Sequence, residues 1–175
     1  IVDRRLRGEK VVLIDLTTRE TRTSRQADHV MLMQPQSDMA ILNCIANQLI
    51  QHGKYDREFV QQHCHFRGPG EPATLPGEII TFEQYKEAVS EYTLQKTAEI
   101  SGLSIEQLRL LGETFARRDL KITSLWCMGV NQHTQGTAVN NLIHAIHLLS
   151  GHWGKPGDGP QSLTGQPSAC GTVRE

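Results

Sequence analysis

The feature that most restricts the fold of this 175-residue chain is the order of its first elements. Residues 10–16, KVVLIDL, form a β-branched apolar run typical of a strand buried on both faces. A hydroxyl-rich loop, LTTRETRTSRQ, follows it, and residues 28–34 predict a second strand. Apolar residues recur at helical spacing over residues 38–52, and Gly53 then predicts the end of a helix. Strand, loop, strand, loop, helix is the order of a parallel α/β sheet.

Residues 55–64 predict a short helix, and the Gly- and Pro-rich residues 65–80 predict a surface loop. Three helices are expected next. Two of them begin with sequences that resemble capping boxes, Thr81 with Gln84 and Ser104 with Gln107.

Residues 120–129, LKITSLWCMG, predict another central strand, and residues 134–150 predict a helix that ends at Gly151. The last 25 residues hold many glycines and prolines, so they predict a long loop without regular structure. Together these features predict an α/β, parallel-sheet fold with flanking helices.

Composition excludes several classes of protein. Lys and Arg number 18 and Asp and Glu 19, so the net charge of −1 argues against nucleic acid as a partner. No apolar run approaches the roughly 18 residues of a membrane span. The cysteines, at positions 44, 64, 127 and 170, lack the close spacing of a self-contained zinc or iron–sulfur site. Neither end carries a starting or terminating pattern, so we expect an internal fragment of a longer protein.

The first candidate site is the turn after KVVLIDL. Ligands of open parallel sheets bind beyond the carboxyl ends of strands. There, Thr17, Thr18 and Thr21 can donate to phosphate oxygens, and Arg19 or Arg22 can pair with them. The G-x-G-x-x-G fingerprint is absent, and a solvated basic loop is the alternative interpretation.

The second candidate is the turn PQSD, residues 35–38. Ser37 or Asp38 can act as a helix N-cap, worth about 1 kcal/mol. Alternatively, the Asp38 carboxylate can accept hydrogen bonds from the N–H donors of a purine edge.

The third candidate is the segment WCMGVNQHTQG, where four side chains crowd a strand-to-helix turn and can converge on a ligand. They are Met128, Asn131, Gln132 and His133. On the following helix, Asn140, His144 and His147 share one side, which is either a polar face or, less readily, part of a metal site. Arg174 is a surface charge or attracts a small anion.

Four strings in this chain resemble a known enzyme group: PQSD, SLWCMGVNQHTQGTAVNNLIHAIHLLSG, SLTGQPSACGTVRE and VVLIDLTTRETRTSRQADH. They are similar to the catalytic subunits of the periplasmic nitrate reductases. These belong to the molybdopterin oxidoreductases of the dimethyl-sulfoxide-reductase family. The resemblance covers essentially the whole chain.

The resemblance implies two molybdopterin guanine dinucleotides around one molybdenum (Mo-bis-molybdopterin guanine dinucleotide) and one [4Fe–4S] cluster. It also implies reduction of nitrate to nitrite in the periplasm, with electrons from a c-type cytochrome. The cysteines that bind the cluster and the molybdenum are expected before Ile1, so this chain supplies no metal ligand. Residues 1–175 would be the central part of the oxidoreductase domain, without the cluster-binding and C-terminal cofactor domains, and inactive alone.

Carried over residue by residue, the resemblance assigns a cofactor-binding set: Thr17, Thr18, Arg19, Glu20, Thr21, Gln36, Ser37, Asp38, Met128 and Gln132. In the loop of residues 17–21 only the position matches, because the family's letters vary there. Guanine N–H donors suit the Asp38 carboxylate. Met128 would lie next to the pterin and the metal, and Arg174 would line the substrate funnel; these two are the catalytic candidates.

Two other functions remain open. An assimilatory nitrate reductase or a formate dehydrogenase would differ in the sequence before Ile1. A non-enzymatic module that binds a guanine nucleotide would need no metal, and Met128 and Arg174 would then be dispensable.

Overall fold

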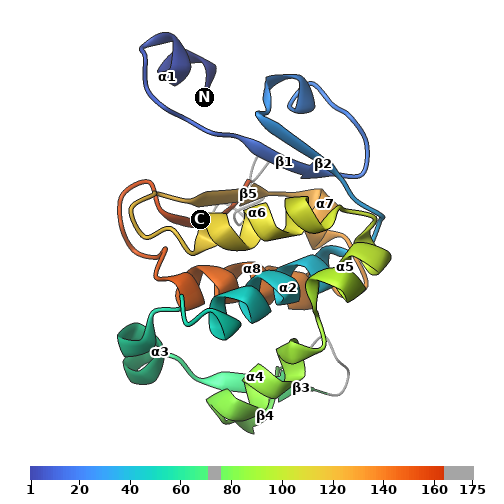
Figure 1. Cartoon of the computed structure of the whole chain (residues 1–175), viewed down its shortest axis with the longest axis vertical. Helices are drawn as coiled ribbons and strands as arrows, with labels where there is room; N and C mark the ends of the chain where they lie inside the picture. The colour runs from blue at the N-terminus through green and yellow to red at the C-terminus, as the bar shows by residue number, and fades with distance from the viewer. Residues whose placement is uncertain (71–75, 164–175) are drawn as a thin grey trace, which may run out of the picture.

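The computed structural model describes residues 1–70 and 76–163 (Figure 1). In chain order the elements are α1 (Val2–Leu6), β1 (Ile14–Thr17), a 3-10 turn (Ser24–Gln26), β2 (His29–Leu32), α2 (Asp38–Gln51), α3 (Arg57–His63), β3 (Phe66–Pro69), β4 (Pro76–Ile80), α4 (Phe82–Ser90), α5 (Leu94–Ser101), α6 (Ile105–Phe115), β5 (Thr123–Trp126), α7 (Met128–Asn131), α8 (Gly136–Ser150) and β6 (Gly159–Ser162). The mixed α/β class predicted from the sequence is confirmed.

The parallel pairing is confirmed, but the strands are less buried than predicted. β1 pairs with β2 and β5 pairs with β6, both in parallel, and β3 pairs with β4 in antiparallel fashion. Every residue of β1 is only half-buried, and Leu125 in β5 is 50% exposed. Among the described residues each parallel strand has a single neighbour, so neither β1 nor β5 is a central strand buried on both faces.

Two segments predicted as loops contain strands. Residues 66–69 and 76–80 form the hairpin β3–β4, and residues 159–162 form β6. The prediction of loops is wrong here because edge strands and irregular ladders accept both Pro and Gly. The β3–β4 register indeed shifts between Arg67 and Pro69, and β6 begins at Gly159, whose φ of +117° suits glycine.

The helices follow the sequence closely. Both predicted capping boxes are present, at Thr81 with Gln84 and at Ser104 with Gln107. The predicted end of α2 is also confirmed, since Gly53 has a φ of +62° and its N–H donates to the carbonyl of Ile50 at 3.0 Å. The last predicted helix starts two residues late, at Gly136, because residues 128–131 form the separate turn α7.

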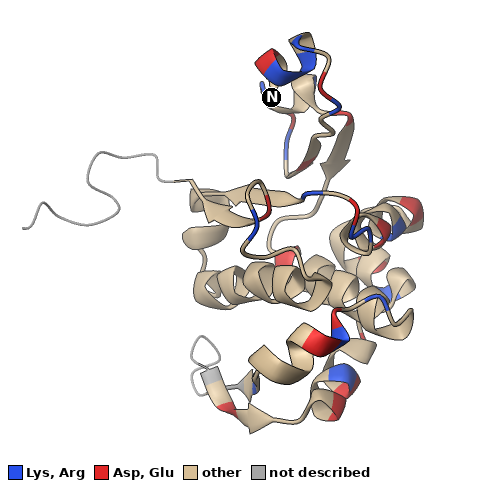
Figure 2. Ribbon diagram, turned by 90° about the vertical axis from the view of Figure 1, so that its left-hand side faces the viewer, with Lys and Arg blue, Asp and Glu red and all other residues tan. Residues whose placement is uncertain are grey.

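The core lies between α2, α6 and α8, with β1–β2 on one side of these helices and the hairpin β3–β4 with α4 on the other (Figure 1). α8 carries no Lys, Arg, Asp or Glu, and α2 carries only Asp38. Charged side chains lie mainly on the outer elements (Figure 2). The described part of the chain has no helix that is both long and apolar enough to cross a membrane.

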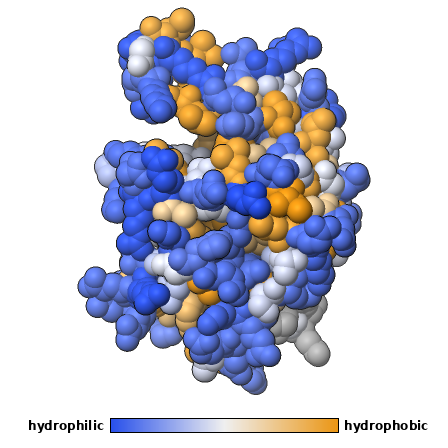
Figure 3. All heavy atoms as spheres, viewed as in Figure 1, coloured by the Kyte–Doolittle hydropathy of each residue, from blue (hydrophilic) through white to orange (hydrophobic). Residues whose placement is uncertain are grey.

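Apolar side chains remain exposed on the parallel strands and on α1. Leu32 in β2 is 50% exposed, Val12 before β1 is 58% exposed, and Leu6 in α1 is 81% exposed. Figure 3 shows apolar atoms at the surface near the top of the molecule, where α1 lies. This agrees with the expectation that strands with a single neighbour leave apolar surface uncovered.

Candidate functional site

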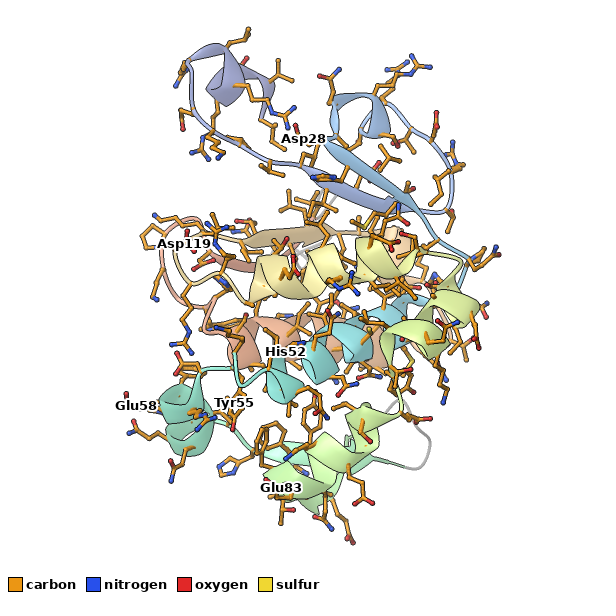
Figure 4. The ribbon with its side chains drawn as sticks, in the orientation of Figure 1. Asp28, His52, Tyr55, Glu58, Glu83 and Asp119 are labelled. Carbon is orange, nitrogen blue, oxygen red and sulfur yellow. The ribbon has the colours of Figure 1, made fainter. Side chains whose placement is uncertain are left out.

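The three candidate segments all follow the carboxyl ends of parallel strands. In Figure 1, β1, β2 and β5 run from left to right, and α6 and α8 return in the opposite direction. Figure 4 labels Asp28 and Asp119, which come before β2 and β5 and mark the amino-terminal side. Residues 17–21, 35–38 and 127–135 therefore leave their strands on the same side of the molecule.

The loop after β1 is folded upon itself. The Thr17 hydroxyl donates to the carbonyl of Arg19 at 3.0 Å, and the Thr21 hydroxyl accepts the backbone N–H of Thr23 at 3.1 Å. Ser24, whose hydroxyl donates to Asp15 at 2.6 Å, closes the loop against β1. Two of the three threonine hydroxyls predicted to meet phosphate are thus engaged within the loop.

The side chains of Thr18, Arg19 and Glu20 are exposed. Among the described residues they make no side-chain hydrogen bond or ion pair. These three side chains are therefore the ones that remain available to a ligand, while Thr17 and Thr21 shape the loop that carries them.

The turn before α2 has an unusual backbone. Gln36 has a φ of +66°, the single positive value recorded for a residue other than glycine in the described chain. For an L-residue the left-handed region costs roughly 1–2 kcal/mol. The turn is held by Gln34, whose N–H donates to the carbonyl of Ser101 at the end of α5, at 2.8 Å. Such a conformation is a known feature of ligand-binding turns.

The helix that follows this turn is not capped by its own side chains. Ser37 occupies the N-cap position, but its hydroxyl donates backwards to the carbonyl of Gln34 at 2.7 Å. Asp38 is the first helical residue and is half-buried, and within the described residues its carboxylate accepts no hydrogen bond and forms no ion pair. The capping interpretation is therefore wrong for both side chains, and the Asp38 carboxylate is left for another partner.

Met128 and Gln132 lie at the two ends of the turn after β5. Met128 is the first residue of α7 and is half-buried, and Gln132 follows its last residue and is exposed. Trp126 holds the turn in place, because its indole N–H donates to Asn131 at 3.1 Å and to Asn140 at 2.8 Å. Neither Met128 nor Gln132 forms a side-chain hydrogen bond within the described residues.

The polar side of α8 faces inward, toward β5. Asn140 bonds Trp126, the His144 ring meets the Trp126 ring edge-on with centroids 5.7 Å apart, and His147 bonds Ser124 at 2.8 Å. This confirms that the three side chains share a face. Among residues 1–70 and 76–163 no cluster of potential metal ligands forms, so the metal alternative gains no support.

His147 is completely buried and neutral. Its Nδ1 lies 2.9 Å from the carbonyl of His152, which can only accept, so Nδ1 is protonated and Nε2 accepts from the Ser124 hydroxyl. Burial lowers the pKa of His147 to about 4. Such a weak base suits a structural contact between α8 and β5 rather than proton transfer.

Arg174 lies outside the described residues, and so does Cys170. The chain can be followed to Leu163, whose N–H donates to the carbonyl of Trp126 at 2.6 Å. The last described residues therefore lie beside the strand end from which Met128 follows.

Two open cavities lie on another part of the molecule. One of about 400 Å³ is lined by aromatic side chains, among them Tyr55 and Phe82, and one of about 330 Å³ lies along α4 near Glu83. Figure 4 labels Tyr55 and Glu83 below the central helices, away from β1 and β2. Neither cavity is lined by a candidate site residue predicted from the sequence.

Sequence reasoning missed the residues that hold the turns in place. No pattern indicated that Gln36 adopts a left-handed conformation, because glycine is the usual sign of one. Asn140 was noticed only as part of a polar helix side. Ser162, which accepts from Asn131 at 3.3 Å, gave no signal because its partner is 31 residues away.

Comparison with known proteins agrees with this architecture. The chain resembles the acetylene hydratase from Pelobacter acetylenicus in structure, with a TM-score of 0.65 and 25% sequence identity. The match covers 87% of this chain and 18% of that protein, so the chain spans about a fifth of its length. The family model described as molybdopterin oxidoreductase matches residues 1–174. A match of this extent shows that the chain belongs to the molybdopterin oxidoreductase family.

Proposed function

We propose that this chain is part of the catalytic subunit of a nitrate reductase that works in the periplasm. Family membership supports a molybdopterin cofactor and redox chemistry. The long strings SLWCMGVNQHTQGTAVNNLIHAIHLLSG and SLTGQPSACGTVRE support the choice of nitrate within that family. The reaction consumes two electrons and two protons and converts nitrate to nitrite and water. A c-type cytochrome is the proposed electron donor.

The observation that carries the proposal is the open amino-terminal end of α2. An Asp at the start of a helix ordinarily meets backbone N–H groups or a basic side chain. Here the hydroxyl of Ser37 turns away and the carboxylate of Asp38 has no partner among the described residues. A guanine presents N–H groups that donate hydrogen bonds to a carboxylate. The Asp38 carboxylate therefore fits the guanine end of a molybdopterin guanine dinucleotide.

Other residues would hold the rest of the cofactor. The exposed side chains of Thr18, Arg19 and Glu20 offer a hydroxyl, a cation and a carboxylate to its phosphates and sugars. Thr17, Thr21 and Gln36 would set the backbone of the two loops, and Met128 and Gln132 would contact the pterin. When bound, the cofactor supplies the molybdenum at which the oxygen atom is transferred; its metal ligand and the [4Fe–4S] cluster would come from other parts of the protein.

Arg174 is the proposed substrate-binding residue, because a guanidinium attracts and orients a small planar anion such as nitrate. In the full-length protein, Arg174→Ala is expected to raise the KM for nitrate or lower kcat while the molybdenum content stays normal. Steady-state kinetics with a chemical electron donor, together with metal analysis, test this. Arg174→Lys, which keeps the charge, should retain more activity than Arg174→Ala.

Two outcomes would overturn the proposal. Loss of molybdenum in Arg174→Ala would make Arg174 a structural residue and remove its substrate role. A full-length wild-type protein that carries the cofactor but forms no nitrite would point to another member of the family, such as a formate dehydrogenase.

A further inference from the structure

The polar side of α8 contains a hydrogen-bond network that links the turn after β5 to β6. Its members are Trp126, Asn131, Gly136, Asn140 and Ser162. Asn140 lies at its centre: its Oδ1 accepts from Trp126 Nε1 at 2.8 Å, and its Nδ2 donates to Asn131 Oδ1 at 2.9 Å and to the Gly136 carbonyl at 2.8 Å.

The orientation of the Asn140 amide is determined by its partners. The indole N–H of Trp126 can only donate, and the carbonyl of Gly136 can only accept. A flipped amide would place donor against donor and acceptor against acceptor. Each polar atom of Asn140 therefore has one possible role, and aspartate or leucine cannot reproduce all three bonds.

The network extends from the turn to β6. Asn131 accepts from both Trp126 and Asn140, and its own amide donates to Ser162 Oγ at 3.3 Å. Backbone bonds reinforce this link, since Trp126 pairs with Ser162 in the β5–β6 ladder and accepts from the N–H of Leu163. Asn140 thus contacts the end of β5 and the turn directly, and it reaches the end of β6 through Asn131.

The turn also lies very close to the start of α8. A Cβ on Gly136 would lie 2.5 Å from the carbonyl oxygen of Asn131 and 3.0 Å from that of Val130. Because these are backbone atoms, they cannot move without shifting the turn. The start of α8 therefore packs closely against the backbone of the turn, and a displacement of the Asn140 side chain would be transmitted to the residues of α7.

We propose that Asn140 is a positioning residue, which sets the turn carrying Met128 and Gln132 against the ends of β5 and β6. The inference rests on the proposed function, because it assigns to this network the positioning of the proposed cofactor contacts Met128 and Gln132. Asn140 acts through Asn131 and Trp126 and needs no contact of its own with cofactor or substrate.

The test compares Asn140→Asp with Asn141→Asp in the full-length protein. The first variant keeps an acceptor for Trp126 but places a carboxylate against the Gly136 carbonyl and Asn131 Oδ1. The second adds the same charge at the next, exposed position of α8 and serves as the matched control. Three quantities are measured: hydrogen exchange of residues 127–136, molybdenum content, and the electron paramagnetic resonance spectrum and turnover of the loaded enzyme.

For Asn140→Asp we expect hydrogen exchange in residues 127–136 to be about tenfold faster or more. We also expect an altered molybdenum spectrum and a lower kcat at unchanged molybdenum content, with none of these changes in Asn141→Asp. Ser162→Ala, at an exposed position that the fold tolerates, should cause a smaller change in the same direction. This keeps the inference testable if Asn140→Asp fails to fold.

Unchanged exchange in both Asn140→Asp and Ser162→Ala would overturn the inference, whatever the activity. Faster exchange with an unchanged spectrum and unchanged kcat and KM would also overturn it, because Asn140 would then be merely structural. A wild-type enzyme that does not reduce nitrate contradicts the proposed function only. The exchange and the molybdenum spectrum still decide the role of Asn140 in that case.

Discussion

The inner face of α8 and the amino-terminal end of α2 differ in whether their polar side chains have hydrogen-bond partners within the protein. Along α8, Asn140 and His147 find protein partners for their polar atoms. At the start of α2, the Asp38 carboxylate has no partner among the described residues, and Gln36 adopts a costly backbone conformation. A chain selected for stability alone would pair the second set as it pairs the first. This difference supports the proposal that the end of α2 binds a ligand.

A comparison of helix starts within the chain sharpens the point. α4 and α6 begin with Thr81 and Ser104, whose hydroxyls accept from the N–H groups of Gln84 and Gln107 at 3.2 Å. α2 also has a serine in the N-cap position, yet the hydroxyl of Ser37 bonds elsewhere. The residue type is equivalent in the three helices, so the difference lies in the turn before α2.

The largest expected effect is a loss of folding stability at acid pH, and it arises on the inner face of α8. The pKa of His147 is lowered from 6.5 to about 4 by burial, so folding favours its neutral form. Stability from this group is complete above pH 6.5 and falls as the pH drops from about 6.5 to about 4. The loss is about 3 kcal/mol. Burial lowers the pKa of His144 as well, which acts in the same direction.

Hydrogen exchange of α8 and β5 in the full-length protein, corrected for the intrinsic effect of pH, measures this loss. The variant His147→Gln keeps a donor and an acceptor but does not titrate, so its exchange should depend less on pH. Equal pH dependence in the two proteins would contradict the assignment of His147 as a buried neutral side chain.

A smaller loss of stability is expected when the N-cap of α6 is removed. Ser104→Ala removes the acceptor for Gln107 N–H and should destabilise α6 by about 1 kcal/mol. Faster hydrogen exchange in the first turn of α6 would show it, with cofactor content unchanged. A loss of cofactor in Ser104→Ala would contradict the distinction between helices with a side-chain N-cap, such as α6, and α2, which has none.

The smallest effect on stability is expected in the turn before α2, where the substitution should stabilise the protein. Gln36→Gly relieves the left-handed conformation, so the turn should become more stable by up to roughly 1 kcal/mol. Slower exchange of residues 34–40 would show this gain. Faster exchange would mean that the Gln36 side chain itself supports the fold.

The features that the sequence predicted and those that it missed differ in the sequence separation of the residues that interact. The end of α2 at Gly53 and the capping boxes of α4 and α6 were predicted because they depend on residues a few positions apart. The hairpin β3–β4 and strand β6 were missed because their partners are distant in sequence or contain Pro and Gly. The turn of Gln36 was missed for another reason: glycine is the usual sign of a positive φ, and the bond from Gln34 that holds this turn goes to Ser101, which is distant in sequence.

The candidate site shows the same division. The sequence located its three segments, since each follows a strand that an apolar run predicts. It did not show that Thr17 and Thr21 are engaged within their own loop, or that Ser37 turns away from its helix. These features depend on side-chain geometry, which local patterns of residue types do not reveal.

The most direct test of the account is the cofactor content of Asp38→Ala in the full-length protein, measured as bound guanine nucleotide per chain. Glu83→Ala is the control, because Glu83 is the acidic residue in the first turn of the capped helix α4. We expect Asp38→Ala to lose most of the nucleotide, since a buried guanine donor left without a partner costs about 1–3 kcal/mol. Glu83→Ala should remain fully loaded. Normal loading of Asp38→Ala, together with faster hydrogen exchange at the start of α2, would instead make Asp38 a stabilising residue of the helix and contradict the account.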